Sequence, residues 1–169
     1  MYVEFNQLSE TSKLWIYIAE RSLSEQELAD LNERSRQFCN AWTSHKSDLF
    51  ASYIIPYSNV LILSADEEKH QASGCSIDES VRWIRSLEKD FHISWMSRFV
   101  VTYIMNQNVQ IAELSNFLET YSESERESIL VVNPNCKIKE DLSSLFLVPF
   151  PRSVYASVNP EILNHSFKL

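Results

Sequence analysis

Short apolar, aromatic and β-branched runs alternate along the chain with two longer stretches of helical periodicity. The first run, 13–19 (KLWIYIA), has the composition of a buried strand. After it, Ser24 and Glu27 have the spacing of a helix capping box. From Leu28 to about Trp42, apolar residues recur at helical intervals and form one stripe. The pattern predicts a strand followed by a long amphipathic helix.

A hairpin and a second helix are predicted next. The strand-like runs 49–55 and 59–63 are separated by Pro56-Tyr57-Ser58, and proline and serine are typical of a tight reversal. The ASGCSIDES stretch that follows has the features of a helix start. The helix is expected to turn one apolar face to the core, formed by Ile77, Val81, Ile84, Leu87 and Phe91.

A second hairpin is predicted from the runs 99–105 and 109–112, which flank Asn106-Gln107-Asn108. The order is then strand, helix, strand, strand, helix, strand. It is the order of a split βαβ or ferredoxin-like fold, in which two helices cover one face of an antiparallel sheet. We therefore expect an α+β, ferredoxin-like core over residues 1–113, with a fifth strand added through the last hairpin.

Beyond residue 113 the periodicity weakens, and several prolines divide the chain into short pieces. The stretch 114–121 suggests a short helix and 129–132 a strand. We expect residues 114–169 to form a C-terminal extension that packs on the core through the apolar residues of 145–150. The chain is then one domain overall, as its length of 169 residues also suggests.

Composition and charge narrow the function classes. Hydrophobic residues make up 44% and charged residues 22% of the chain, values that are typical of a folded domain. The net charge of -8 opposes nucleic-acid binding, which needs a basic face. The N-terminus lacks the pattern of a signal peptide, and no apolar run approaches a membrane span. We expect a cytoplasmic protein with no nucleic-acid or membrane partner.

Glycine and cysteine usage limits the cofactors. The sequence has one glycine, whereas the glycine-rich phosphate loops of nucleotide-binding proteins need several at fixed spacing. Three widely spaced cysteines suggest neither a disulfide framework nor a metal knuckle, and they are expected to be free thiols: Cys39, Cys75 and Cys136. We predict no cofactor.

The start of the second helix is the strongest candidate for chemistry. Ser76 and Glu79 repeat the capping-box spacing, so that Ser76 is the predicted N-cap and Gly74 gives the preceding turn its backbone freedom. Cys75, just outside the helix, would have its thiol pKa lowered by the helix dipole, and His45 is the candidate base. The alternative is structural: Cys75 packs as an apolar residue, and His45 sits at the end of the first helix because the dipole favours it there.

Two weaker sites share this region. The backbone and hydroxyls of Gly74, Ser76 and Ser80 are candidate ligand contacts at the helix start. Asp66, after a predicted strand, and Asp78, in the second helix, could converge and supply oxygen ligands for Mg²⁺ or Ca²⁺. Their spacing does not match a known calcium loop, and charged loops are usually solvated, so no metal is predicted.

Aromatic side chains recur in the predicted strands. They would line one open sheet face, where RNA-binding proteins of this fold stack bases, but the acidic charge opposes that use. Coverage of this face by the C-terminal extension or by a second subunit is the simpler expectation. The residues concerned are Trp15, Tyr17, Tyr53, Tyr57 and Tyr103.

The combination of Trp15-Ile16-Tyr17, Trp42-x-x-His45 and Ser73-Gly74-Cys75-Ser76-Ile77-Asp78-x-Ser80 resembles a family of small Bacteroidota proteins. These proteins are often labelled "ABC transporter ATPase", and no activity is established for the family. The resemblance covers residues 1 to about 115 and places emphasis on the glycine-cysteine turn. An ATPase of that class needs a P-loop and a Walker B carboxylate, and this sequence has no P-loop.

Two functions follow as hypotheses. The first is a non-catalytic cytoplasmic binding or interaction module whose sheet face takes a protein partner or a second copy of the chain. The alternative is a small-ligand or thiol-dependent enzyme site at the Gly74–Cys75 turn, with His45 as base or orienting residue.

Overall fold

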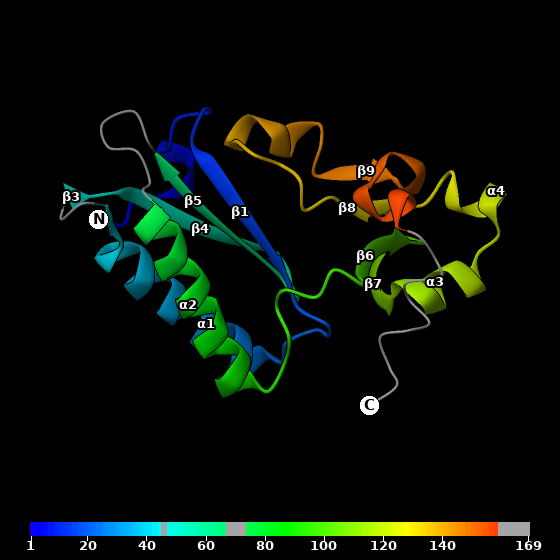
Figure 1. Ribbon diagram of the computed structural model, residues 1–169, viewed down its shortest axis with the longest axis horizontal. Coiled ribbons are helices and arrows are strands. Elements are labelled where there is room, and N and C mark those ends of the chain that lie inside the picture. The colour runs from blue at the N-terminus through cyan, green and yellow to red at the C-terminus, as the bar shows by residue number, and fades with distance from the viewer. Residues whose placement is uncertain (45–46, 67–73, 159–169) are drawn as a thin grey trace.

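Two antiparallel sheets, one of three strands and one of four, organise the protein in a computed structural model (Figure 1). The structure describes residues 1–44, 47–66 and 74–158. Two long helices lie together on the first sheet, and shorter helices accompany the second (Figure 1). The α+β class expected from the sequence is confirmed, whereas the structure does not show a ferredoxin-like topology.

The first sheet contains β1 (Lys13–Ile18), β5 (Val60–Asp66) and β4 (Phe50–Tyr57), in that order and antiparallel throughout. The central strand β5 is buried from Val60 to Ala65, because both faces of the sheet are covered. Pro56 does not lie in the turn, as the sequence suggested. It falls in the edge strand β4 at a bulge, where a missing N–H is tolerated, and the turn is Ser58–Asn59.

Helix α1 (Glu25–Ala41) begins where the sequence predicts. The Glu27 N–H donates to the Ser24 hydroxyl at 3.3 Å, and the Ser24 N–H donates to the Glu27 carboxylate at 2.8 Å. Helix α2 (Gly74–Phe91) runs beside α1 on the same face of the sheet (Figure 1). The Phe38 and Trp83 rings stack between the two helices with centroids 4.4 Å apart.

The end of α2 is fixed by a left-handed residue. His92 has a φ of 52°, and the Ile93 N–H donates to the Glu88 carbonyl at 3.2 Å, the bond pattern of a Schellman motif. The Glu88 carboxylate then accepts the Trp95 N–H at 2.8 Å. Together these bonds set the direction in which the chain leaves α2.

The second sheet has the strand order β7-β6-β8-β9. Its hairpin of β6 and β7 is closed by Asn106 and Gln107, whose φ values of 50° and 64° are those of a type I′ turn. The two remaining strands come from the region after residue 113. The bounds are β6 (Val100–Met105), β7 (Asn108–Glu113), β8 (Leu130–Val132) and β9 (Leu147–Pro149).

Short elements complete the described chain. Helices α3 (Leu114–Thr120) and α4 (Glu123–Arg126) follow β7, and the two-residue strands β2 (Thr43–Ser44) and β3 (Ser47–Asp48) follow α1. No described helix is long and apolar enough to span a bilayer. The 3-10 helices are η1 (Phe5–Gln7), η2 (Lys139–Ser143), η3 (Phe150–Arg152) and η4 (Val154–Ser157).

The strand expected to complete a ferredoxin-like sheet, β6, pairs with β7 and β8 instead of β1. In the described chain, β1 meets that region through one parallel bridge, Ile18 to Met96. A split βαβ arrangement would require an antiparallel neighbour at this edge. The first half of the expected topology, β1-α1-β4-β5, is therefore present, and the second half departs from it.

The aromatic strand residues do not share one face. Trp15, Tyr17 and Tyr53 pack in the cluster under α1 and α2, while Tyr57 faces the other side and stacks on Phe146 with centroids 6.0 Å apart. Tyr103 belongs to the second sheet and its own apolar cluster. The first sheet is thus covered on both faces by its own chain.

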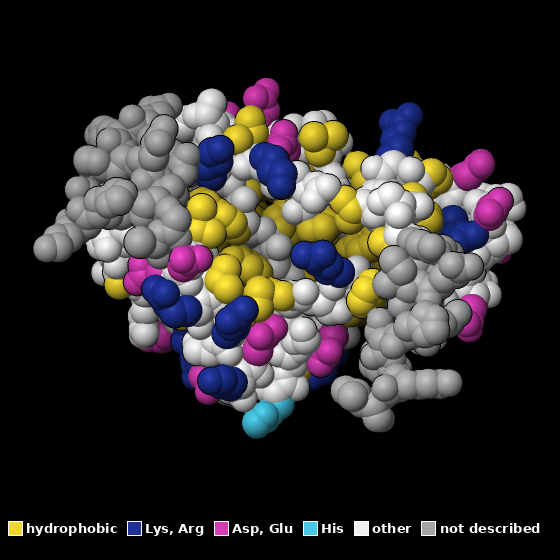
Figure 2. All heavy atoms as spheres, in the orientation of Figure 1, with side chains coloured by type: hydrophobic (Ala, Val, Ile, Leu, Met, Phe, Trp, Pro, Cys, Tyr) yellow, Lys and Arg dark blue, Asp and Glu magenta, His cyan; other side chains and the backbone are white. Residues whose placement is uncertain are grey.

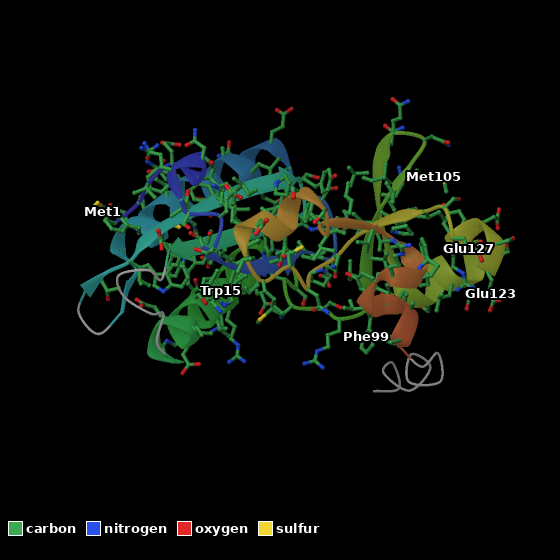
Figure 3. The ribbon with its side chains drawn as sticks, turned by 90° about the horizontal axis from the view of Figure 1, so that it is seen from above. Met1, Trp15, Phe99, Met105, Glu123 and Glu127 are labelled. Carbon is green, nitrogen blue, oxygen red and sulfur yellow. The ribbon has the colours of Figure 1, made fainter. Side chains whose placement is uncertain are left out.

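The two sheets lie one after the other along the molecule. From above (Figure 3), Met1 marks one end and Glu123 and Glu127 the other. An apolar cluster joins the sheets, and its fully or largely buried members are Leu14, Ile18, Val60, Ile62, Val100, Val132 and Cys136.

A buried amide crosses the same junction. Asn59, in the turn between β4 and β5, donates from Nδ2 to the Thr102 hydroxyl oxygen of β6 at 2.7 Å and to the Ala19 carbonyl at 3.1 Å. Neither Asn59 nor Thr102 has exposed surface. A buried polar group needs its partners, so this bond selects the relative placement of the two sheets.

We expect Thr102→Val to lower the free energy of unfolding by about 1–3 kcal/mol, because the near-isosteric side chain leaves a buried Asn59 N–H without an acceptor. Urea denaturation measures the change. A double-mutant cycle with Asn59→Ala provides the control. A Thr102→Val cost that is the same in both backgrounds contradicts the coupling.

Acid should weaken the contact between the start of α1 and the end of α2. Arg21 donates to both Glu27 oxygens, at 2.8 and 3.0 Å, and to the Phe91 carbonyl at 3.0 Å. The Arg21 hydrogen bonds, followed by the Ser24 N–H, lower the pKa of Glu27 from 4.5 to about 2. The ionised carboxylate therefore stabilises the fold above about pH 4.5, and this contribution is lost as the pH falls toward 2.

We expect Glu27→Gln to reduce stability at pH 7, and the difference from the unmodified chain to shrink between about pH 4.5 and 2. Thermal unfolding at a series of pH values measures it. Glu25→Gln is the control, since Glu25 lies exposed in the same turn with no side-chain hydrogen bond to a described residue. Equal pH dependence of the two variants argues against the Arg21–Glu27 contact.

Candidate functional site

The glycine-cysteine turn is placed differently from the prediction. Helix α2 begins at Gly74, and Gly74 has no positive φ angle. Ser76 is therefore the third helical residue and not the N-cap, and the glycine does not supply a left-handed turn. The side chains of Cys75 and Ser76 lie outside the described part of the structure, as does His45. A Cys75–His45 site stays a prediction.

The reason given for His45 does not hold. Helix α1 ends at Ala41 with Trp42 as C-cap, and Thr43–Ser44 already pair with Ser47–Asp48. His45 falls in the connection between these strands and does not end the helix. Because the field of a helix dipole fades within the last turn, the dipole cannot be invoked there.

The other residues singled out from the sequence are partly accounted for. Ser80 is fully buried, and its hydroxyl donates to the Ile77 carbonyl at 2.7 Å and lies 3.4 Å from the Tyr17 hydroxyl. Asp66 ends β5 and Asp78 is exposed on α2. Across the described residues, no group of three or more His, Cys, Asp and Glu side chains is placed to hold a metal ion.

Both cysteines with described side chains are buried free thiols. Burial raises the pKa of Cys39 to about 12 and that of Cys136 to about 11. A thiol with a raised pKa is almost wholly protonated at neutral pH and is a poor nucleophile. Cys39 and Cys136 therefore act as core residues.

The fold forms a cavity of about 490 Å³ along the edge of β1 that faces away from β5, here called the β1-edge cavity. Hydrophobic side chains gather in the middle of the face that contains β1, between the long helices and the second sheet (Figure 2). The described lining residues come from four separate segments. They are Ile16–Ile18, Trp95–Arg98, Pro134–Asn135, and Val154, Tyr155 and Val158.

The edge of β1 is covered at its two ends only. The Leu14 N–H donates to the Lys137 carbonyl at 2.9 Å, and the Ile18 N–H donates to the Trp95 carbonyl at 3.2 Å. Because alternate residues of a strand direct their backbone groups to the same edge, Ile16 presents its N–H and C=O between these two bonds. No described residue bonds them. The cavity therefore contains an unused strand edge.

The wall formed by 95–98 is held in place by α2. The Glu88 carboxylate accepts the Trp95 N–H, as described above, and the Glu20 N–H donates to the Ser94 carbonyl at 3.1 Å. Trp95 is 1% exposed and anchors this segment in the core under the helices. Met96 and Arg98 are left exposed beside the cavity.

The opposite wall contains a buried tyrosine without a hydrogen bond. Tyr155, in η4, is 4% exposed and packs in the apolar cluster of the second sheet. Burial raises the pKa of its phenol, and its hydroxyl has no hydrogen-bond partner among the described residues. Buried tyrosine hydroxyls usually have a partner, so this one is available to a bound molecule.

Two further cavities are less suited to an apolar ligand. One, of about 530 Å³, lies between α4 and η4 and includes Glu123, Arg126 and Glu127. The other, of about 390 Å³, is lined by the acidic side of α1 at Glu27, Asp30 and Glu33. Arg98 is the one charged residue among the described lining of the β1-edge cavity.

Sequence reasoning did not find this cavity. Arg98 and Tyr155 stand in short irregular segments that carry no motif, and no periodicity connects them with β1. The available signal was the isolated Trp95-Met96-Ser97-Arg98 stretch, which combines apolar residues with one cation between two predicted elements.

Comparisons with known proteins supply no template for the site: no family model, no curated protein and no solved structure matches the chain.

Removal of the Tyr155 hydroxyl tests whether it is unbonded. We expect Tyr155→Phe to leave the free energy of unfolding unchanged or slightly higher, because no hydrogen bond is lost. Tyr53→Phe is the matched control: its hydroxyl donates to the Asn32 carbonyl at 2.8 Å, and about 1 kcal/mol should be lost. Urea denaturation compares them. An equal loss in both variants indicates that Tyr155 already has a partner.

Proposed function

We propose that the protein is a non-catalytic binding module that takes a small apolar ligand into the β1-edge cavity. The supporting observation is the combination of a cavity of about 490 Å³, apolar walls, and polar groups with no partner in the described chain. Small-molecule sites typically measure about 300–1,000 Å³ and combine apolar walls with a few polar groups.

The chemistry of the lining favours binding over catalysis. None of its described residues is a His, Cys, Asp, Glu or Lys, the side chains that most often transfer protons or form covalent intermediates. Tyr155 has a raised pKa and is therefore a weak base at neutral pH. A bound molecule would be held and shielded from water without being transformed.

The proposal moves binding from the face of the first sheet to its edge. The face expected to receive a partner is packed against α1 and α2, and the reverse face against the second sheet and Phe146. At the edge, the backbone of Ile16 offers one donor and one acceptor. A protein partner or a second copy of the chain is the competing occupant.

A neutral fluorescent probe, N-phenyl-1-naphthylamine, tests the proposal in the full chain. We expect its emission to rise on binding, and Val154→Trp to weaken binding at least about tenfold by filling the cavity. Val154 lines the β1-edge cavity and not the cavity beside α4. Ala156→Trp is the matched control, since Ala156 lines only the latter of these two cavities. Circular dichroism checks that both variants fold.

Three results would contradict the proposal. Absence of probe binding to the full chain excludes an available apolar site. Binding that appears only when the chain is cut after Val158 identifies residues 159–169 as the occupant. A dimer in sedimentation that Val154→Trp dissociates identifies a second copy as the occupant.

A further inference from the structure

We infer that the natural ligand of the β1-edge cavity is an organic carboxylate with an aromatic or branched aliphatic body, paired with Arg98. This inference rests on the proposed binding function and specifies the ligand class. It follows from the charge of the lining, the unused hydrogen-bonding groups, and the shape of the apolar wall.

The charge of the cavity is opposite to that of the protein. The chain has a net charge of -8, yet Arg98 is the single charged residue among the described lining residues. Arg98 makes no ion pair and no hydrogen bond with any described residue. Each of the other arginines that meet a carboxylate in a salt bridge, Arg21 and Arg34, stands beside an acidic residue of α1. Arg98 is thus a cation without its anion.

The two neighbouring cavities show the contrast. In the cavity beside α4, Arg126 is accompanied by Glu123 and Glu127, which leave the lining net acidic. The cavity on α1 has carboxylates and no cation. An anion is therefore repelled at both places and attracted at the β1-edge cavity.

Donors for a carboxylate are available in the same cavity. A guanidinium presents a planar fork that binds the two oxygens of a carboxylate together, and such charge-assisted bonds are about twice as strong as neutral ones. The Ile16 N–H and the Tyr155 hydroxyl are additional donors without a described partner. A neutral amide would lack the attraction to Arg98.

The walls specify the rest of the ligand. The side chains of Ile16, Ile18, Met96, Val154 and Val158 line the cavity and none of them can hydrogen-bond. Met96 is 38% exposed and unbranched, so it can adapt to different shapes at the rim. An apolar body is removed from water there, while an extended polar chain such as a peptide would leave its amide groups unpaired.

A charge-matched pair of probes tests the inference in the full chain. We expect 4-phenylbutyrate to compete with N-phenyl-1-naphthylamine about tenfold more strongly than 4-phenylbutanamide, which has the same shape and no charge. Arg98→Gln should abolish this preference and leave the affinity for the amide unchanged. Arg98→Lys should retain part of it. Higher salt should reduce it, because Arg98 is exposed and screened.

Arg152→Gln is the control for net charge, since Arg152 is exposed and does not line the cavity. Equal competition by the two probes in the unmodified chain overturns the ligand class but leaves the binding function in place. A preference that survives Arg98→Gln overturns the role of Arg98. If neither probe and no naphthylamine binds, the proposed function itself fails.

Discussion

One buried amide determines how the two halves of this protein meet. Asn59 lies in a turn of two residues, and its side chain bonds Ala19 at the end of β1 and Thr102 in β6. Its carbonyl also accepts the Ala19 N–H at 2.8 Å, so one residue fixes the first strand, the central hairpin and the second sheet together. The Asn59 Oδ1 atom is buried without a partner, and this cost is tolerated because the Nδ2 bonds have no substitute at the junction.

The junction explains why the edge of β1 is open. Thr102 binds Asn59 at the end of the first sheet, so β6 starts a new sheet and cannot run along β1 as the last strand of a ferredoxin-like fold would. What remains beside β1 is the segment that leads to β6, bonded at Ile18, and the segment bonded at Leu14. The β1-edge cavity is the space between these two contacts. Its position is therefore a consequence of the topology and not of any local motif.

The sequence predicted the elements far better than their pairing. Capping at Ser24, the two long helices and the hairpin at Asn106–Gln107 were all encoded locally, by spacing and turn residues. The partner of β6 was not, because residues 100–103 are all buried, and a strand buried on both faces has no alternation to mark which sheet it joins. Likewise, Ser76 had capping-box spacing, yet α2 begins earlier at Gly74, since spacing alone does not select the first helical turn.

The net charge of the chain seems at first to oppose an anionic ligand, but range separates the two effects. At physiological ionic strength the field of a distant surface carboxylate is screened within about 8 Å, so most of the acidic surface acts on the rate of encounter. Affinity depends on the groups in contact, and in the described lining of the β1-edge cavity these are Arg98 and neutral residues. An overall acidic protein can therefore hold an anion at one basic position, and the acidic remainder would favour ligands whose apolar body contributes most of the binding energy.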